Sequence, residues 1–117
     1  MAVLVDGVVA RIGSPQEVWT NPGTVIVARL IGHPNIVSGG LGSGVPLSLP
    51  MAAISQDASG NHAGVVMDTT FTDGRYRVTV SLEHSDDYVS FLTDDPPTIT
   101  APITLSIDKT QAISLHP

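Results

Sequence analysis

A hairpin signal near the middle of the chain restricts its fold most strongly. Residues 64–82 read GVVMDTTFTDGRYRVTVSL. Asp73-Gly74 marks the turn, because a two-residue hairpin loop needs positive φ at both central residues and Asp-Gly tolerates it. Since side chains alternate along a strand, one face then carries four cross-strand pairs. The expected pairs are Phe71–Tyr76, Thr69–Val78, Met67–Val80 and Val65–Leu82.

The opposite face of this hairpin is polar and is interrupted only by Val66. Its polar members are Asp68, Thr70, Arg75, Arg77, Thr79 and Ser81. Two neighbouring arginines can hold a carboxylate or an oxyanion, because the guanidinium fork matches its geometry. A cross-strand ion pair with Asp68 is the simpler alternative. The candidate anion or regulatory contact therefore consists of Asp68, Arg75 and Arg77.

The composition favours one ordered, mainly β domain. The chain has 117 residues, of which 42% are hydrophobic and 14% charged, and its 11 Gly and 9 Pro favour many turns. A net charge of −6 disfavours nucleic acid as a partner, because a phosphate backbone would be repelled. Without Cys, the chain has no disulfide framework, thiolate zinc site or Cys nucleophile. No apolar run has the length of a membrane span.

Residues 2–12 predict a second, smaller hairpin. Asp6-Gly7 supplies its turn, which would pair Val5 with Val8 and Val3 with Ala10. Both strands are apolar on both faces up to Arg11, a pattern that suits burial on two sides or a piece of a larger sheet. The chain begins inside this expected strand, so we expect it to be a fragment of a longer protein.

Two short helices should follow this hairpin. Ser14, with Pro15 next and Glu17 three residues on, forms a capping-box pattern that starts a helix over about residues 15–20. Asn21-Pro22 is expected to cap a second helix, which Gly32 and Pro34 end. The single Trp, Trp19, would either pack between these helices or mark a surface that meets another part of a longer protein.

The remaining strand signals are short and suggest a small barrel or sandwich. After a Gly/Ser/Pro-rich crossing, we expect strands at Val45–Leu49, Met51–Ile54, Tyr88–Leu92, Ile103–Ile107 and Ala112–Leu115. Val45, Leu47 and Leu49 should share a face. In the same way Ile103, Leu105 and Ile107 should point into the core, because apolar and polar residues alternate there.

No motif predicts catalysis, a metal or a cofactor. Gly39 and Gly44 have the spacing of a phosphate-binding loop, but Val45 stands where that loop requires Lys. The histidines are dispersed, and two aspartate pairs in loops are expected to be solvated. These residues are His33, His62, His84, His116, Asp86-Asp87 and Asp94-Asp95. We predict no catalytic residue, no metal ligand and no cofactor-binding residue.

Residues 4–36 resemble the end of the nucleotide-binding domain of an ABC-type importer's ATP-binding subunit, of the maltose/sugar-transporter kind. The motifs in order are Asp6-Gly7, Ile12–Glu17 with Val18-Trp19 and Pro22, Val27–Gly32, and Pro34-Asn35. The rest resembles the TOBE (transport-associated OB) domain that follows. Its pattern is carried by Phe71, Gly74, Tyr76, Val78, Val80, Leu82 and the segment Pro102–Asp108, with Lys109 where Pro is usual.

The resemblance implies two parts, residues 1–36 as the tail of the nucleotide-binding domain and residues 37–117 as an OB-like β-barrel. It implies a non-catalytic regulatory and dimerisation module. Its partners would be a second copy through the barrel, the parent nucleotide-binding domain and membrane permease subunits, at the cytoplasmic face of the cell membrane. The ATPase motifs themselves are missing, so this piece would not hydrolyse ATP, whereas its parent would. The alternative is a module that senses a small solute or oxyanion and feeds back on transport.

Overall fold

The computed structural model describes residues 1–38, 41, 44–83 and 85–117 and has a mainly β fold. The strands are β1 Ala2–Val5, β2 Val8–Ile12, β3 Asn35–Val37, β4 Leu47–Leu49, β5 Ile54–Gln56, β6 His62–Thr72, β7 Arg75–Leu82, β8 Tyr88–Thr93, β9 Pro102–Ile107 and β10 Ile113–Ser114. The helices are α1 Pro15–Thr20 and α2 Val25–Leu30, with 3₁₀ turns η1 Met51–Ala53 and η2 Lys109–Gln111. The expected class, a mainly β chain with a hairpin and two short helices in front, is confirmed.

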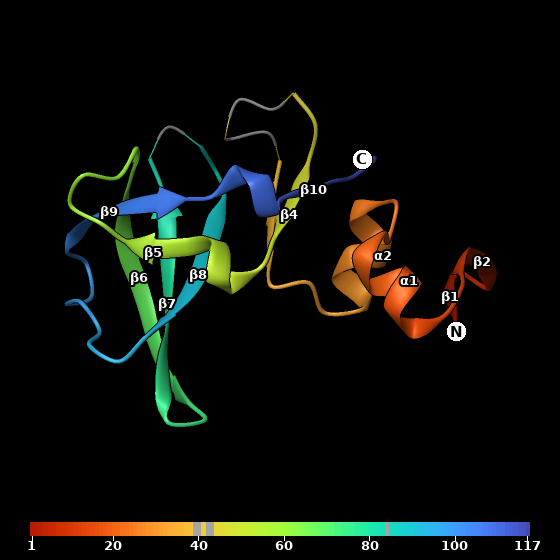
Figure 1. Cartoon of the computed structure of the whole chain (residues 1–117), viewed down its shortest axis with the longest axis horizontal. Helices are drawn as coiled ribbons and strands as arrows, with labels where there is room; N and C mark the ends of the chain where they lie inside the picture. Colours follow the sequence, from red (N-terminus) through yellow and green to blue (C-terminus); the bar gives the residue numbers. More distant parts are fainter. Residues whose placement is uncertain (39–40, 42–43, 84) are drawn as a thin grey trace.

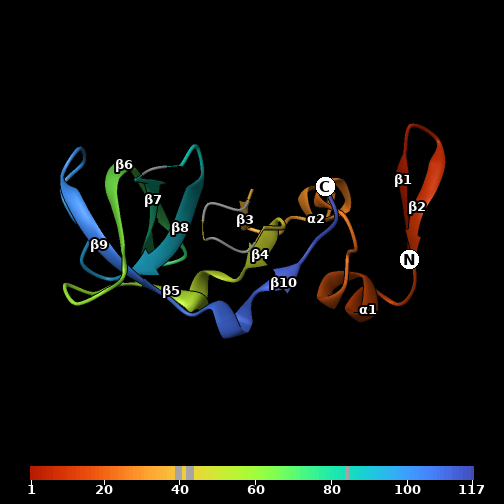
Figure 2. The same ribbon diagram turned by 90° about the horizontal axis from the view of Figure 1, so that it is seen from above.

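The largest sheet has five antiparallel strands in the order β5-β9-β6-β7-β8. Its edge strands β5 and β8 also contact each other, so the sheet curls around one core (Figure 2). This shape is compatible with the OB-like barrel. A smaller sheet, β10-β4-β3, lies beside β8. The β1–β2 hairpin and the helices occupy the other end of an elongated molecule of 43 × 33 × 24 Å (Figure 1).

Two separate hydrophobic clusters lie at the two ends of this molecule. The larger fills the curled sheet and includes the predicted inward residues of β9; its members are Val37, Leu41, Leu47, Leu49, Ala53, Ile54, Val66, Val78, Val80, Leu82, Val89, Phe91, Ile103, Leu105 and Ile107. The smaller consists of Val3, Val18 and Val27, with Ile31 packed against it. We call residues 1–34 the N-terminal unit and residues 35–112 the barrel unit.

The central hairpin forms at the predicted turn, but its predicted register holds only near that turn. Asp73 (φ 50°) and Gly74 (φ 80°) adopt the left-handed backbone that such a turn requires. Phe71 faces Tyr76 and Thr69 faces Val78, as predicted. Beyond Asp68 the register shifts by one residue at a β-bulge, so the predicted partners Met67–Val80 and Val65–Leu82 are wrong. Val80 instead faces Val66, and Leu82 faces Gly64.

The bulge exchanges the two faces of β6. Val66, which the alternation placed among the polar residues, is completely buried. Val65 and Met67, which were placed on the face opposite the polar one, are 41% and 48% exposed. The reason is that one extra residue on one strand moves every later side chain to the opposite face.

The N-terminal unit follows the predicted order with two corrections. The capping box is present, with the Glu17 amide donating to Ser14 Oγ (3.2 Å) and the Ser14 amide donating to Glu17 Oε1 (3.4 Å). In the first hairpin Val5 faces Val8 as predicted, but a bulge places Val3 opposite Arg11 and not Ala10.

The second helix begins later than predicted. Asn21 ends α1, because its amide bonds to Glu17 O. Thr24 is the N-cap of α2, and its hydroxyl accepts from the Val27 amide. Gly23 lies between them with φ 86°, a conformation that excludes it from a helix.

The middle of the chain differs most from its prediction. β3 was not predicted, and the strand expected at Met51–Ile54 is a 3₁₀ turn, η1, that leads into β5. Leu47 and Leu49 are buried as expected, whereas Val45 precedes the strand and is 42% exposed. Gly39 and His84 lie outside the described residues.

Candidate functional site

The predicted contact residues lie on the outer surface of the β6–β7 hairpin but do not form one cluster. Arg75 and Arg77 face Thr72 and Thr70 across the strands, and Asp68 faces Thr79. Arg75 Nε donates to Asp94 Oδ1 at 3.0 Å, so its ion-pair partner is not Asp68. The two side chains are 48% and 81% exposed, and such screened pairs contribute at most about 1 kcal/mol.

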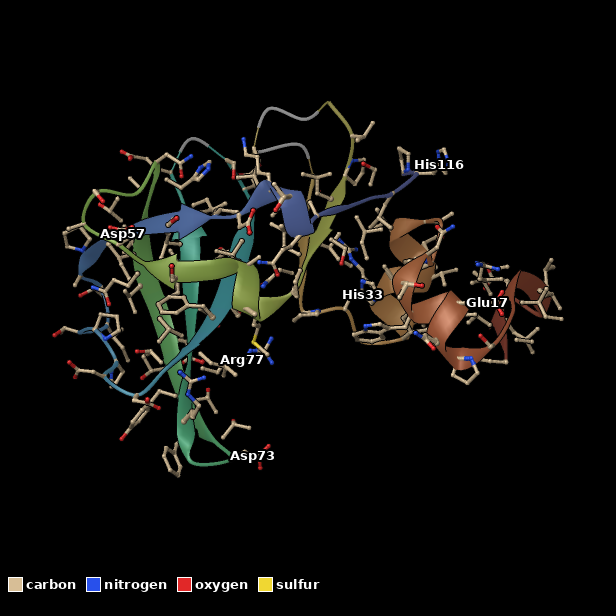
Figure 3. All side chains as sticks on the ribbon, in the orientation of Figure 1. Glu17, His33, Asp57, Asp73, Arg77 and His116 are labelled. Atoms are coloured by element: carbon tan, nitrogen blue, oxygen red, sulfur yellow. The ribbon has the colours of Figure 1, made fainter. Side chains whose placement is uncertain are left out.

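The surroundings of Arg75 make it a poor anion site. A hollow of about 420 Å³ beside it is also lined by Asp94 and Asp95. Two carboxylates against one guanidinium leave this hollow with negative charge, which repels an oxyanion. Within the described residues Arg77 has no ion-pair partner and remains the better candidate; Figure 3 labels it on the hairpin, away from the turn.

The described histidines and carboxylates do not assemble a metal site. No group of three or more His, Asp or Glu residues within the described ranges could hold a metal ion. His33 is engaged elsewhere: its Nδ1 bonds to Ser48 Oγ and its Nε2 to Trp19 O at 2.8 Å. Burial lowers the pKa of His33, although the hydrogen bond to Trp19 O opposes that change. The pKa of His62 is lowered by burial and, to a smaller degree, by the nearby Lys109 ammonium.

Exposed apolar side chains gather on the N-terminal unit. The β1–β2 sheet has only two strands, and large hydrophobic residues of this unit are 47% to 67% exposed. They are Met1, Leu4, Val8, Val9, Ile12, Trp19, Ile26 and Leu30. Such a group of exposed large apolar side chains on one small unit marks an interaction site. The apolar pattern on both faces of residues 2–12 indicated it in the sequence, whereas the exposure of Ile26 and Leu30 on α2 was missed.

A second apolar strip lies on the outer surface of the barrel unit, around the β6 bulge. Val65, Met67 and Ile99 are each 41% to 48% exposed. Backbone hydrogen bonds from Thr100 N to Val66 O and from Val66 N to Ala101 O hold the two segments together. Thr100 has φ 70°, which is strained for a β-branched residue. We call Val65, Met67 and Ile99 the bulge strip. The alternation of side chains along β6 does not predict that its members face outward.

Comparison with known proteins relates the chain to a transport protein. No family model matches it. It is 33% identical over 97 residues to the spermidine/putrescine import ATP-binding protein PotA of Nitratidesulfovibrio vulgaris, a match that covers 83% of this chain and 25% of that protein. The chain thus spans about a quarter of the length of this curated relative. No helix in the described part of the chain is long and apolar enough to cross a membrane. Over most of its length, then, this chain is similar to part of an importer's ATP-binding subunit.

Proposed function

We propose that this chain is the C-terminal, non-catalytic part of the ATP-binding subunit of an ABC-type importer. In this proposal residues 1–36 are the last elements of the nucleotide-binding domain, and residues 37–117 form a TOBE-type barrel that regulates and helps to dimerise the subunit. The boundary falls within β3, which pairs with β4. The parent protein would hydrolyse ATP and join permease subunits at the cytoplasmic face of the membrane.

The observation that carries this proposal is the apolar surface of the N-terminal unit. A two-stranded hairpin is at best marginally stable by itself, and β2 has Val8, Val9 and Ile12 exposed by 54% to 67%. A Val or Ile side chain gains about 1.5–3 kcal/mol on passing from full exposure to full burial, so each of these would gain roughly half to two thirds of that. A nucleotide-binding domain that supplies neighbouring strands and helices would provide this burial. The similarity to an ATP-binding subunit supports this choice of partner.

The bulge strip is the best-placed surface for the proposed homodimer. Two copies that each carry a charge of −6 repel one another, so an interface must avoid acidic residues. Val65, Met67 and Ile99 are uncharged, and Val65 also lines, with Gly64, a groove of about 440 Å³. Light scattering tests the dimer: Met67→Asp should yield monomers, and Thr70→Asp, farther along the same strand, should not. A wild-type monomer at high micromolar concentration would contradict dimerisation.

A binding experiment tests the main proposal. The part of the PotA relative that lies outside its match to this chain is supplied as a separate polypeptide, and its complex with this chain is measured by calorimetry. We expect Val9→Asp to weaken the complex at least tenfold, because it places a charge on the apolar hairpin. Ile99→Asp is the matched control on the barrel unit and should bind like the wild type. Equal binding by both variants, or none by the wild type, would overturn the proposal.

A second candidate function is feedback sensing of a small solute or oxyanion. Arg77 favours it, because its exposed guanidinium has no ion-pair partner within the described residues. Calorimetry against putrescine, spermidine, sugars, amino acids, phosphate and sulfate would decide, with Arg77→Gln as the control. Heat that disappears in this variant supports a site at Arg77, and the absence of heat from every solute rejects sensing by this chain.

A further inference from the structure

Each unit has its own hydrophobic cluster, whereas the connection between the N-terminal unit and the barrel unit is made mainly by hydrogen bonds. The hydrophobic clusters of the two units are separate, and no cluster of the described residues includes members of both. Leu115 is 3% exposed but belongs to neither cluster. Apart from the chain itself, the hydrogen bonds between the described residues of the two units come from two places, the side chain of His33 and residues 113–116.

Residues 113–116, which we call the strap, bind both units in succession. Ile113 and Ser114 pair with β4 of the barrel unit, and the Leu115 amide donates to Pro46 O at 2.9 Å. The next residue, His116, turns to the N-terminal unit. Its amide donates to Gly23 O at 2.8 Å, and its carbonyl accepts from the Val25 amide at 3.0 Å. Figures 2 and 3 show this end of the chain reaching α2.

His33 provides the second connection. Its ring lies 4.4 Å from the Trp19 ring, and its two nitrogens bond to Trp19 O on α1 and to Ser48 Oγ on β4. Ser48 is only 2% exposed, so this contact is made inside the joint and not on its surface. A partly open pocket of about 150 Å³ beside His33 is lined by residues of both units, including Trp19 and Ser48. The two units therefore meet through directional hydrogen bonds beside a small open pocket.

We infer that the strap and His33 together form a latch that sets the orientation of the N-terminal unit relative to the barrel unit. Among the described residues, few directional bonds hold the units, and no hydrophobic cluster with members of both resists their rotation. Breaking the bonds should therefore release this rotation while each unit keeps its own core. Such a latch lets the barrel unit control the orientation of any partner that docks on the apolar N-terminal surface.

The structure offers a substitution that removes one latch bond without changing the helix. Val25 is the first residue of α2, a position where proline fits because the amide there has no partner within the helix. Thr24 before it has φ −124° and ψ 160°, which a following proline also accepts. Val25→Pro therefore deletes the donor to His116 O. Val25→Ala is the matched control, since it trims the same side chain and keeps the amide.

Distance measurement between spin labels tests the latch in the full chain. The sequence has no Cys, so Gln16→Cys on α1 and Gln56→Cys on β5 attach labels to one exposed site in each unit. We expect a single narrow distance distribution for the background chain and for Val25→Ala, and at least a twofold broader one for Val25→Pro. Broadening in Val25→Ala as well would assign the effect to side-chain packing and overturn the role of the strap.

A second variant keeps the test decisive if Val25→Pro loses helical structure. His33→Ala removes both side-chain bonds of His33 and leaves the strap intact, and it should also broaden the distribution. Amide chemical shifts of β6 to β9 must stay unchanged, which shows that the barrel unit is folded. A narrow, unshifted distribution in His33→Ala, with the barrel unit folded, would refute the latch.

Discussion

Replacement of Asn35 by alanine should destabilise the protein more than its small volume suggests. β8 is an edge of the five-stranded sheet, so backbone groups on its outer side have no strand to pair with. The Asn35 side chain takes the place of that strand at one residue. Its Nδ2 donates to Ser90 O at 2.8 Å, and its Oδ1 accepts from the Ser90 amide at 2.6 Å.

The expected magnitude follows from burial. Asn35 and Ser90 are 1% and 5% exposed, so water cannot replace the lost partner. Each of the two buried backbone groups left without a hydrogen bond costs about 1–3 kcal/mol, which makes the total about 2–6 kcal/mol. Typical domains have about 5–15 kcal/mol of stability, so a large share would be lost.

Urea unfolding followed by circular dichroism measures this change, and hydrogen exchange of the Ser90 amide localises it. Asn35→Ala should lower the unfolding free energy by at least about 2 kcal/mol and accelerate exchange at Ser90. Asn61→Ala is the control, because Asn61 is an exposed asparagine in a loop. A loss below about 0.5 kcal/mol, within the range of surface substitutions, would refute the reasoning.

Three further predictions concern a cap, a glycine and a histidine. Ser14→Ala should lower the unfolding free energy by about 1 kcal/mol in urea, because the Glu17 amide loses its acceptor. Gly64→Ala should cost about 1–3 kcal/mol in the same assay, since its Cβ would lie 2.5 Å from Ser81 O, whereas Gly13→Ala should cost less than 1 kcal/mol. Burial lowers the pKa of His33 below its ordinary 6.5, so the unfolded chain binds the proton more readily. Stability should therefore fall as pH drops below about 6.5, and His33→Gln should reduce that slope in urea titrations at pH 7.5, 6.5 and 5.5; an unchanged slope would contradict it.

Local rules predicted the parts of the fold that depend on neighbouring residues. The two Asp-Gly turns form because few other residue pairs accept positive φ twice, and the Ser14–Glu17 capping box forms because its partners are three residues apart. The alternation of apolar and polar residues also predicted which side chains of β9 point into the core. Each of these features is decided within a few residues of the chain.

Local sequence rules did not predict the features that depend on residues far apart in the chain. The β6 bulge at Met67 satisfies packing of Val66 in the core and pairing with Ala101 and Thr100, which lie far along the chain. β3 is held by its pairing with β4 and by the Asn35 contact to Ser90. With only three residues, this strand is too short for either contact to show as a hydrophobic alternation in the sequence. The partner of Arg75 was missed for the same reason, because Asp94 reaches it only once β8 has paired with β7.

The strap also has a consequence for the order in which the protein assembles during synthesis. Residues 23–25 leave the ribosome long before residues 113–116, and chains fold as they emerge. The N-terminal unit can complete its cap and its small cluster early, but His116, which bonds to Gly23 and Val25, is not yet available. The orientation of the N-terminal unit relative to the barrel unit is therefore fixed only after the barrel strands have been synthesised. A chaperone or partner chain that binds the apolar hairpin before this point binds a unit that can still rotate relative to the barrel unit.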